Sequence, residues 1–501
     1  MEFLVAAAAG LMGGLCTIVT PAIGSAYLQS LCGLTSMSEL STHLSEGAHI
    51  YYPGSENFTK ATARWSTLNA PNITLVVEVA TENDVAETVK YANAQNVPFV
   101  AVNGGHGAVS SMGKVYNGVE IWLNQLNSIS IAKDGRTATF GGGVLSKQVT
   151  DALWEEGKQT VTGGCECTSL LGPALGGGHG FLQGHYGLIA DQFVSLNMVL
   201  ANGSLINVRE DSDLWWAVKG AGHNFGIVTS VTSKIYDVSN GGLWSFQSFI
   251  FTHDKVESVY EAINQHLVEQ PADLINYSVF LNEPSIDADN AIIVLFILRE
   301  GIDAVETQYT KPFTRLGPIA TQVGKGTYQD LTKWTGLSND APPCQKANLS
   351  NIRFPVDIQN YNPAAQRSSI DTFSRVTREN PALNQSFCMF EGYSLKGVQE
   401  IPAESTAFPH REANLLIALV VVYEGSGSTR DEEARVFGES LRHIIFEGSD
   451  QEKLYAYVNY ASGVETPESM YGYEPWRLER LRRLKAKYDP NDRFSFYAPF
   501  T

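Results

Sequence analysis

Two glycine-rich stretches of this chain contain the residue types that could react with a bound ligand. Residues 103–107 read NGGHG and include His106, and residues 163–180 begin with GGC, which includes Cys165. Glycine lets a backbone approach a flat or phosphorylated ligand closely, because no Cβ stands between them. An imidazole and a thiol beside such a ligand are nucleophiles that could form a covalent bond with it. The simpler interpretations are a hydrogen-bonded loop histidine and a buried core thiol.

The residues around the first stretch predict how it is positioned. Residues 75–79 form an apolar run, and residues 99–102 form a second one that leads directly into NGGHG. Between them, Thr81 begins a sequence typical of a helix N-cap, and apolar residues recur at helical spacing from Val85 to Ala92. The sequence therefore predicts a β-α-β unit. Its glycine loop follows the second strand, at the carboxyl end where open α/β sheets bind ligands.

Composition limits the class of protein. The 501 residues suffice for two domains, and 53 acidic against 35 basic residues give a net charge of −18. Such an acidic chain repels nucleic acid and anionic lipid, and we expect neither as a main partner. The sequence has no dinucleotide fingerprint of the Rossmann type and no P-loop. We also expect no metal site, because the one-residue spacing of Cys165 and Cys167 is unusual for zinc.

The first 26 residues form an apolar stretch that ends in small residues, Gly24 and Ala26. This pattern predicts a cleaved signal peptide and a secreted protein, although Glu2 stands where a basic residue is usual. A membrane anchor is the alternative, but glycine and proline interrupt the stretch, so we expect no stable membrane association. Six Asn-x-Ser/Thr sequons permit glycosylation, at Asn57, Asn72, Asn202, Asn276, Asn348 and Asn384.

Cleavage of that peptide would leave an odd number of cysteines, namely Cys32, Cys165, Cys167, Cys344 and Cys388. One thiol would then be free, or bonded to something other than a cysteine. A bond between Cys165 and a ligand would leave an even number for disulfides.

Seven motifs, taken in order, resemble one family. They are NGGHG (103–107), GGC (163–165), LGGGHG (175–180), YGLIAD (186–191), DLWWAVKGAGHNFGIVTS (213–230), YVNY (457–460) and KYDPNDRF (487–494). With them the chain resembles the vanillyl-alcohol-oxidase/berberine-bridge-enzyme superfamily of FAD-linked oxidoreductases. The resemblance implies an α+β fold. It would have a two-lobed FAD-binding domain of the PCMH type and an inserted substrate domain with an antiparallel sheet flanked by helices.

The same resemblance implies a domain organisation. Residues 27–240 would form the FAD-binding domain, with a core at about 68–239, and residues 241–453 the substrate domain. Residues 454–501 would be a berberine-bridge-like segment that returns to the FAD domain. Within the substrate domain, alternating apolar residues predict strands at 244–251, 277–282, 291–298 and 415–423, and helices at 255–269, 303–312 and 430–447. The basic residues of 477–487 are expected on the solvated face of a further helix.

The resemblance also implies FAD bonded to His106 through the flavin 8α-methyl group, and offers Cys165 for a second bond, to flavin C6. Residues 168–169 read Thr-Ser where the family often has Val-Gly, so the loop could lie differently and Cys167 competes with Cys165. In the family, the residue at the position of Thr168 controls the access of dioxygen to the flavin, and the resemblance implies that Thr168 is small enough to admit it. The other positions expected at the flavin are Asn103, Gly104, Gly105, Gly107, Gly172, Gly176, Gly177, Gly178, Gly180, Asn224, Gly226, Ile227, Val228, Asn459 and Tyr460.

For proton transfer, Tyr457 and Asn459 match a Tyr-x-Asn motif that lies near the flavin in the family. Tyr457 is the expected general base or the residue that positions one. On an extended strand, Tyr457 and Asn459 would share one face and Tyr460 would lie behind them. Glu391 and Tyr393 are further candidates for the base.

The predicted activity is that of an FAD-dependent oxidase, most simply one of secondary metabolism. It would take a hydride from an alcohol, amine or activated C–H group of a small organic molecule and pass the electrons to dioxygen, giving hydrogen peroxide. Two alternatives stay open: oxidation of an oligosaccharide, and a cyclisation on a flavin scaffold without net oxidation.

Overall fold

The computed structural model describes residues 39–412, 415–425, 427 and 429–501. The predicted signal peptide and Cys32 lie outside these residues. Over the part of the chain that is described, no helix combines the length and the apolar character needed to cross a bilayer.

The N-terminal part begins with a four-stranded sheet in the order β1-β2-β4-β3. Its elements are β1 (His49–Tyr51), α3 (Glu56–Thr62), β2 (Ile73–Glu78), α4 (Glu82–Ala94), β3 (Phe99–Val102) and β4 (Gly118–Trp122). Strand β4 runs parallel to both β2 and β3. At the start of α4, the Thr81 hydroxyl accepts from the Asp84 N–H and the Asp84 carboxylate accepts from the Thr81 N–H, forming a capping box. The predicted β-α-β unit is confirmed.

A five-stranded antiparallel sheet follows, in the order β5-β6-β10-β8-β9. Its strands are β5 (Ile129–Ile131), β6 (Thr137–Gly141), β8 (Phe193–Val199), β9 (Leu205–Val208) and β10 (Ile227–Lys234), and β7 (Lys158–Gln159) pairs separately with β11 (Tyr236–Asp237). The helices around it are α5 (Ser146–Glu155), α6 (Leu171–Leu175), α7 (Gln183–Tyr186) and α8 (Leu214–Val218). A turn at Asn202-Gly203 joins β8 to β9, and Gly203 has a φ of +81° there.

The middle of the chain forms a seven-stranded antiparallel sheet in the order β15-β12-β14-β13-β17-β18-β16. Its strands are β12 (Leu243–Phe251), β13 (Leu274–Leu281), β14 (Ile292–Glu300), β15 (Ala320–Thr327), β16 (Leu349–Ile358), β17 (Phe387–Gly392) and β18 (Leu415–Glu424). Short helices α11 (Leu331–Trp334) and α13 (Lys396–Gln399) lie in its connections.

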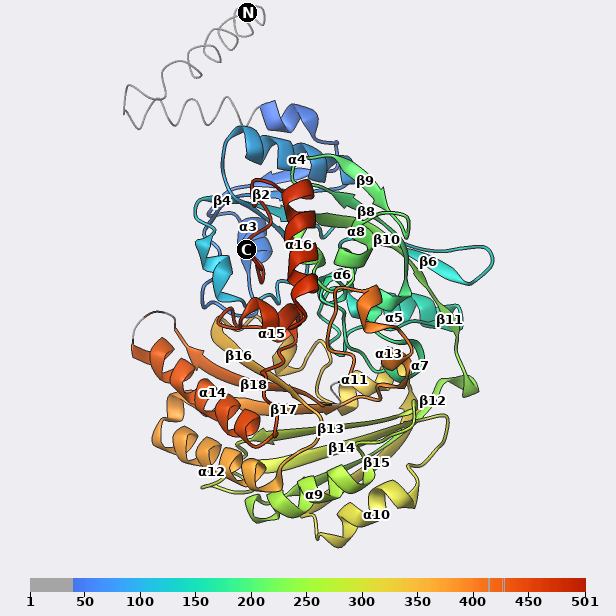
Figure 1. Ribbon diagram of the computed structural model, residues 1–501, viewed down its shortest axis with the longest axis vertical. Helices are drawn as coiled ribbons and strands as arrows, with labels where there is room; N and C mark the ends of the chain where they lie inside the picture. Colours follow the sequence, from blue (N-terminus) through green and yellow to red (C-terminus); the bar gives the residue numbers. More distant parts are fainter. Residues whose placement is uncertain (1–38, 413–414, 426, 428) are drawn as a thin grey trace, which may run out of the picture.

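The two faces of this sheet have different neighbours. Helices α9 (Val256–His266), α10 (Thr307–Arg315), α12 (Pro363–Glu379) and α14 (Thr429–Glu447) cover the face away from the N-terminal part (Figure 1). Along β16, Ile352 and Phe354 enter the hydrophobic core under these helices, whereas Arg353 points to the opposite face. That opposite face is directed at the N-terminal part and lines a cavity.

The C-terminal residues lie against the N-terminal part, with α15 (Pro467–Tyr471) and α16 (Pro475–Tyr488) beside its helices (Figure 1). Tyr471, Leu478 and Leu481 belong to the same hydrophobic core as Leu171 and Leu175 of α6. An antiparallel sheet layered with helices, next to a mixed N-terminal part, confirms the predicted α+β class.

The basic run on α16 is only partly solvated, contrary to expectation. Arg477 and Lys485 are buried. Arg477 donates to the carbonyls of Ala403 and Thr406, and Lys485 pairs with the Asp489 carboxylate at 2.7 Å. Protein oxygens thus replace water around these two cations, which keeps their burial from being prohibitively costly.

Candidate active site

A cavity of about 370 Å³ lies between the glycine-rich loops and the open face of the seven-stranded sheet. Its loop wall contains Asn103, Gly104, Gly105, His106, Gly107, Gly163, Gly164, Cys165, Thr168 and Gly172. Its sheet wall contains side chains of β13, β16, β17 and β18, namely Tyr277, Arg353, Phe387, Met389, Glu391 and Val420. Other predicted site residues that line it are Gly226, Ile227, Val228, Tyr393, Tyr457, Asn459 and Tyr460.

Five predicted flavin residues are not among the residues that line this cavity, namely Gly176, Gly177, Gly178, Gly180 and Asn224. The glycines serve close packing, because a Cβ on Gly176 would collide with the Asn459 side chain and one on Gly180 with the Thr162 carbonyl. Asn224 donates to the Tyr471 hydroxyl, at 3.2 Å. These residues support the walls of the cavity from behind.

The NGGHG loop is held at the end of β3 by its first residue. Asn103 Nδ2 donates to the carbonyls of Gly142 and Val144, at 3.2 and 3.0 Å. Gly105 has a φ of +72°, which favours glycine. A Cβ on Gly104 would lie 2.9 Å from the Cys167 carbonyl oxygen, so the two glycine-rich loops can approach only where this side chain is absent.

The His106 ring lies on this loop and lines the cavity. Its Nδ1 is 3.1 Å from the Gly104 carbonyl oxygen, and the ring stacks at 6.4 Å, between centroids, on Trp65. Burial, with a smaller effect of the Arg353 charge, lowers the pKa of His106 to about 4. The imidazole is therefore neutral at pH 7, the form in which a ring nitrogen is nucleophilic.

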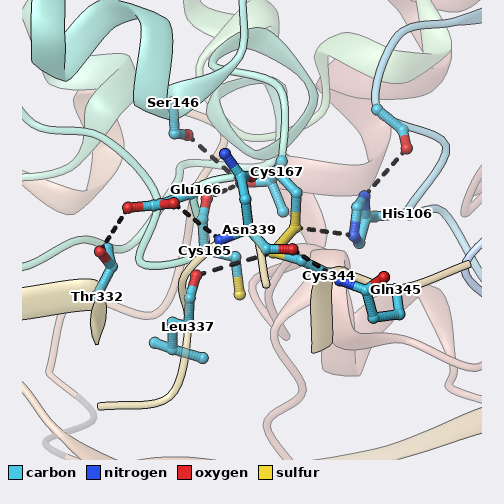
Figure 2. Close-up of a disulfide and its surroundings, with 12 residues drawn as sticks. His106, Ser146, Cys165, Glu166, Cys167, Thr332, Leu337, Asn339, Cys344 and Gln345 are labelled. Carbon is cyan, nitrogen blue, oxygen red and sulfur yellow. Dashed lines mark hydrogen bonds between the residues drawn. A yellow bond between two sulfur atoms is a disulfide. The ribbon is translucent and has the colours of Figure 1, made fainter. Parts of the chain in front are cut away.

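A disulfide next to His106 settles which cysteine is available. Cys167 is bonded to Cys344, with a Cα–Cα distance of 5.6 Å, and its Sγ lies 3.4 Å from His106 Nε2 (Figure 2). The expectation that Cys167 competes for the flavin is therefore wrong, because its sulfur is already bonded. Cys165 keeps a free thiol that lines the cavity. Burial, assisted by the Glu391 charge, raises the pKa of this thiol to about 12.

The disulfide also fastens the segment that follows α11 to the loop wall. Glu166, between the two cysteines of the loop, accepts from the Thr332 hydroxyl at 2.7 Å and from the Asn339 N–H at 2.8 Å (Figure 2). Leu337 and Pro343 of this segment line the cavity. A residue pair 177 positions apart thus helps to close the space between the two walls.

Glu391 on the sheet wall is a buried carboxylate with two phenol donors. The Tyr393 hydroxyl donates to Oε1 at 2.7 Å, and the Tyr460 hydroxyl donates to Oε2 at 2.9 Å. Burial raises the pKa of Glu391 to about 7, although the two phenols and the Arg353 charge act in the opposite direction. A carboxylate with a pKa near the working pH suits general acid–base catalysis.

The YVNY segment is not the extended strand that the sequence predicts. Val458–Tyr460 form a 3₁₀-helical turn that begins after Tyr457. A 3₁₀ turn rotates successive side chains by about 120° instead of alternating them, so Tyr457, Asn459 and Tyr460 all line the cavity. Tyr460, expected behind the others, instead contacts Glu391.

Tyr457 has partners other than a carboxylate. Its hydroxyl oxygen accepts from Asn459 Nδ2 at 2.5 Å and from the His179 N–H at 3.4 Å. Burial raises the pKa of Tyr457 above its ordinary value, so this phenol is neutral at pH 7. The two hydrogen bonds lower the pKa, but burial outweighs them, so Tyr457 suits shaping the site better than accepting a proton.

Sequence reasoning missed several residues of the site. Trp65, Leu337, Arg353, Phe387, Met389 and Val420 line the cavity but belong to none of the motifs. The Arg353 guanidinium carbon lies 4.1 Å from the centre of the Trp65 ring. The alternation of apolar residues at 352, 354 and 356 is the signal that could have placed Arg353 on the open face of a strand.

The cavity has features that fit a bound flavin. Asn459 Oδ1 and His223 Nδ1 are buried in its wall without a hydrogen-bond partner among the described residues, so a ligand can supply one. The lining also includes Phe99, Arg493 and Phe494, which belong to the N-terminal and C-terminal parts of the chain. Glycine backbone and unpaired polar atoms are what a flat ring system with a polar tail requires.

Comparison with known proteins agrees with this reading of the cavity. Residues 73–209 match the family model for an FAD binding domain, and residues 456–499 match the model for berberine and berberine-like proteins. The FAD-linked oxidoreductase chyH of Penicillium rubens is 50% identical over 464 residues, covering 92% of this chain and 93% of the relative. The FAD-linked oxidoreductase chry5 of Gibberella zeae is 47% identical over 504 residues, covering 94% and 99%.

The chain therefore belongs to the berberine-bridge-enzyme-like family of FAD-linked oxidoreductases, and the predicted resemblance is confirmed. Solved structures show the same fold at low identity. Xylooligosaccharide oxidase from Myceliophthora thermophila matches with a TM-score of 0.79 at 19% identity, over 93% of this chain and 98% of that one. The BBE-like 1 protein of Physcomitrella patens matches with a TM-score of 0.77 at 21% identity, over 93% and 99%.

Proposed function

We propose that this enzyme is an oxidase that takes a hydride from an alcohol, amine or activated C–H group of a small, largely apolar molecule and delivers the electrons to dioxygen. The observation that carries the proposal is Glu391. A buried carboxylate with a pKa of about 7 stands between two phenols, in the same cavity as the glycine-rich loops.

In this proposal Glu391 accepts the proton that the substrate loses. The Tyr393 and Tyr460 hydroxyls hold the carboxylate in place and stabilise its charge, and Tyr457 with Asn459 shapes the opposite side of the site. FAD, when bound, supplies the hydride acceptor and the route for electrons to dioxygen. Apolar side chains of the sheet wall exclude water from the transfer.

We further propose that His106 holds the FAD covalently and that Cys165 is the site of any second bond. His106 is neutral and lines the cavity, and Cys165 is the free thiol of the loop wall. Acid precipitation of the purified enzyme should leave yellow colour in the pellet, and His106→Ala should keep that colour only where Cys165 is bonded as well. Flavin found entirely in the supernatant of the parent enzyme would refute both bonds.

The sheet wall favours an apolar substrate over a sugar. Phe387, Met389 and Val420 form its centre, and they offer no hydrogen bonds to the hydroxyl groups of an oligosaccharide. Structural relatives include xylooligosaccharide and chitooligosaccharide oxidases, so sugar oxidation is the second candidate.

One experiment separates the candidates. The yellow enzyme is mixed under nitrogen with aromatic or polyketide-like alcohols and amines, and in parallel with oligosaccharides. We expect bleaching by the first group, and recovery of colour with release of peroxide when air is admitted. Bleaching by oligosaccharides alone would favour the second candidate, and product formation without any bleaching would indicate a cyclase.

Secretion remains a proposal that rests on the first 26 residues. The Cys167–Cys344 disulfide agrees with it, because such bonds persist in oxidising compartments. Of the six sequons, Asn276 is buried on β13 and donates to the Gln270 side chain at 2.7 Å, so the folded protein has no room for a glycan there. Mass spectrometry of protein from culture medium should find an N-terminus near residue 27 and no glycan on Asn276.

A further inference from the structure

Arg353 is a cation of the sheet wall without an anionic partner. It forms no salt bridge within the described residues, and its one hydrogen bond there runs from Nη1 to the Asn459 carbonyl oxygen, at 3.3 Å. Four buried arginines, Arg64, Arg411, Arg442 and Arg477, each have a carboxylate within reach. A guanidinium stays charged at any physiological pH, so Arg353 holds a full positive charge beside the cavity.

The Arg353 guanidinium lies against two aromatic rings. Its carbon lies 4.1 Å from the centre of the Trp65 ring and 5.5 Å from the centre of the Tyr460 ring. Such contacts stabilise a cation through the faces of the rings but satisfy none of its N–H donors. The donors of guanidinium lie in its plane, and those not bonded to Asn459 have no acceptor among the described residues.

The strand register relates Arg353 to Glu391. Arg353 pairs with Val420, which in turn pairs with Phe387, so these three form one row across β16, β18 and β17. Glu391 is four residues further along β17, a separation of about 13 Å along the strand. Met389 lies between the rows on the same face. The Tyr460 ring contacts the Arg353 guanidinium and its hydroxyl donates to Glu391, so the two side chains approach each other more closely than their rows do. The sheet wall thus presents a cation and the proposed base, with apolar side chains between their rows.

We propose that Arg353 binds the carboxylate group of a flat, largely apolar substrate, whose reacting group then lies at Glu391. The planar fork of a guanidinium matches a carboxylate, which accepts two parallel hydrogen bonds. The inference rests on the proposed oxidase function for the role of Glu391, but the binding of the carboxylate does not depend on turnover.

Benzoate and benzamide provide the test, because they have nearly the same shape and differ in charge. Each is titrated into the holoenzyme, and binding is followed by the change in the visible spectrum of the bound flavin. We expect benzoate to bind the parent enzyme about 10- to 100-fold more tightly than benzamide, as a hydrogen-bonded charge pair would give. Arg353→Gln should abolish this preference. Arg375→Gln, which removes an exposed cation from α12 on the opposite face of the sheet, should leave this preference unchanged.

Arg353→Lys keeps the positive charge but lacks the planar pair of N–H donors. It is the variant to use if Arg353→Gln does not fold. It should weaken benzoate several-fold and leave benzamide unaffected. Equal affinities in the parent enzyme, a preference that survives in Arg353→Gln, or an unchanged benzoate affinity in Arg353→Lys would each overturn the proposal. A preference that depends on Arg353, in an enzyme that no alcohol or amine can bleach, would refute the oxidase function and leave this inference standing. Bleaching by a neutral amine, in an enzyme that shows no preference for benzoate, would support the oxidase function and overturn the role of Arg353.

Discussion

The loop wall and the sheet wall of the cavity are built from different parts of the polypeptide. The loop wall presents mainly backbone, because its glycines stand where side chains would collide; Gly104 and Gly107 have neighbouring atoms 2.9 Å from the position of a Cβ. The sheet wall presents side chains from strands whose backbone groups are bonded to one another. Backbone atoms are the same in every sequence. The side chains of a strand, by contrast, can be replaced without moving the strand.

This difference suggests where a family can change and where it cannot. A substitution of Gly104 or Gly107 in the loop wall would push apart backbone that approaches the proposed flavin site, so it threatens cofactor binding itself. A substitution of Phe387 or Met389 alters the surface offered to the substrate while the ladder of β17 stays in register. Cofactor binding and substrate choice can therefore vary separately, and the predictions below probe that separation.

The largest effect is expected for Glu391→Gln on the sheet wall. Removal of a general base typically costs about 10²- to 10⁴-fold in the catalysed step. Anaerobic stopped-flow measurement should show flavin reduction slowed by that factor, with the spectrum of the bound flavin unchanged. Glu283→Gln, at a partly exposed position after β13, is the matched control and should reduce at the parental rate. Loss of flavin from Glu391→Gln would show that the sheet wall also determines cofactor binding.

The same residue predicts the pH dependence of flavin reduction. Burial raises the pKa of Glu391 to about 7, and only the ionised carboxylate can accept a proton. The rate should therefore be low in acid, rise through about pH 7 and level off above it. Glu391→Gln should lose this step. A rate that rises only near the pKa of a phenol would indicate Tyr457 as the base, as the sequence first suggested.

The next effect concerns the disulfide that joins the loop wall to the segment after α11. Cys344→Ser should lower the free energy of unfolding by about 2–4 kcal/mol, because the unfolded chain is no longer cross-linked. Thermal unfolding followed by flavin fluorescence measures it. Cys388→Ala removes a buried free thiol from β17 and is the control, with a smaller expected loss. If Cys344→Ser unfolds at the parental temperature, the bond does not hold the walls together.

A change confined to the loop wall should affect reoxidation alone. Thr168 lines the cavity, and its hydroxyl donates to the Cys165 carbonyl at 2.9 Å. Thr168→Leu adds bulk there and should slow reoxidation in air by about tenfold, a barrier change of about 1.4 kcal/mol. Reduction by substrate should stay at the parental rate. Thr168→Ser is the control for loss of the methyl group. Slow reoxidation of the parent enzyme itself would contradict the proposed oxidase function.

The two walls also differ in how far the sequence could predict them. Glycines with special backbone angles and capping residues carry local information, so the β-α-β unit and the NGGHG loop could be placed in advance. Strand β16 was missed because Pro355 and polar residues interrupt its pattern. Such a proline is tolerated because β16 is an edge strand of its sheet, which only the assembled fold reveals. Arg353 was missed together with its strand.

Contacts between distant residues were equally beyond sequence reasoning. The pairing of Cys167 with Cys344 depends on how the segment after α11 folds back over the loop wall. The YVNY segment was misjudged because four residues cannot distinguish a strand from a 3₁₀ turn by their polarity. That error hid the contact between Tyr460 and Glu391, which brings the C-terminal segment to the sheet wall.

The smallest effect tests that contact. The Tyr460 hydroxyl donates to Glu391 and stabilises its ionised form, so Tyr460→Phe should raise the pKa of the carboxyl group further. Because the base must be ionised, the midpoint of the pH profile for flavin reduction should move upward by about one unit, equivalent to about 1.4 kcal/mol, while the rate at high pH changes little. Tyr457→Phe has no bond to Glu391 to remove and should leave the midpoint in place. If the midpoint shifted in Tyr457→Phe and not in Tyr460→Phe, Tyr457 would be the residue that accepts the proton. The base would then belong to the C-terminal turn and not to the sheet wall.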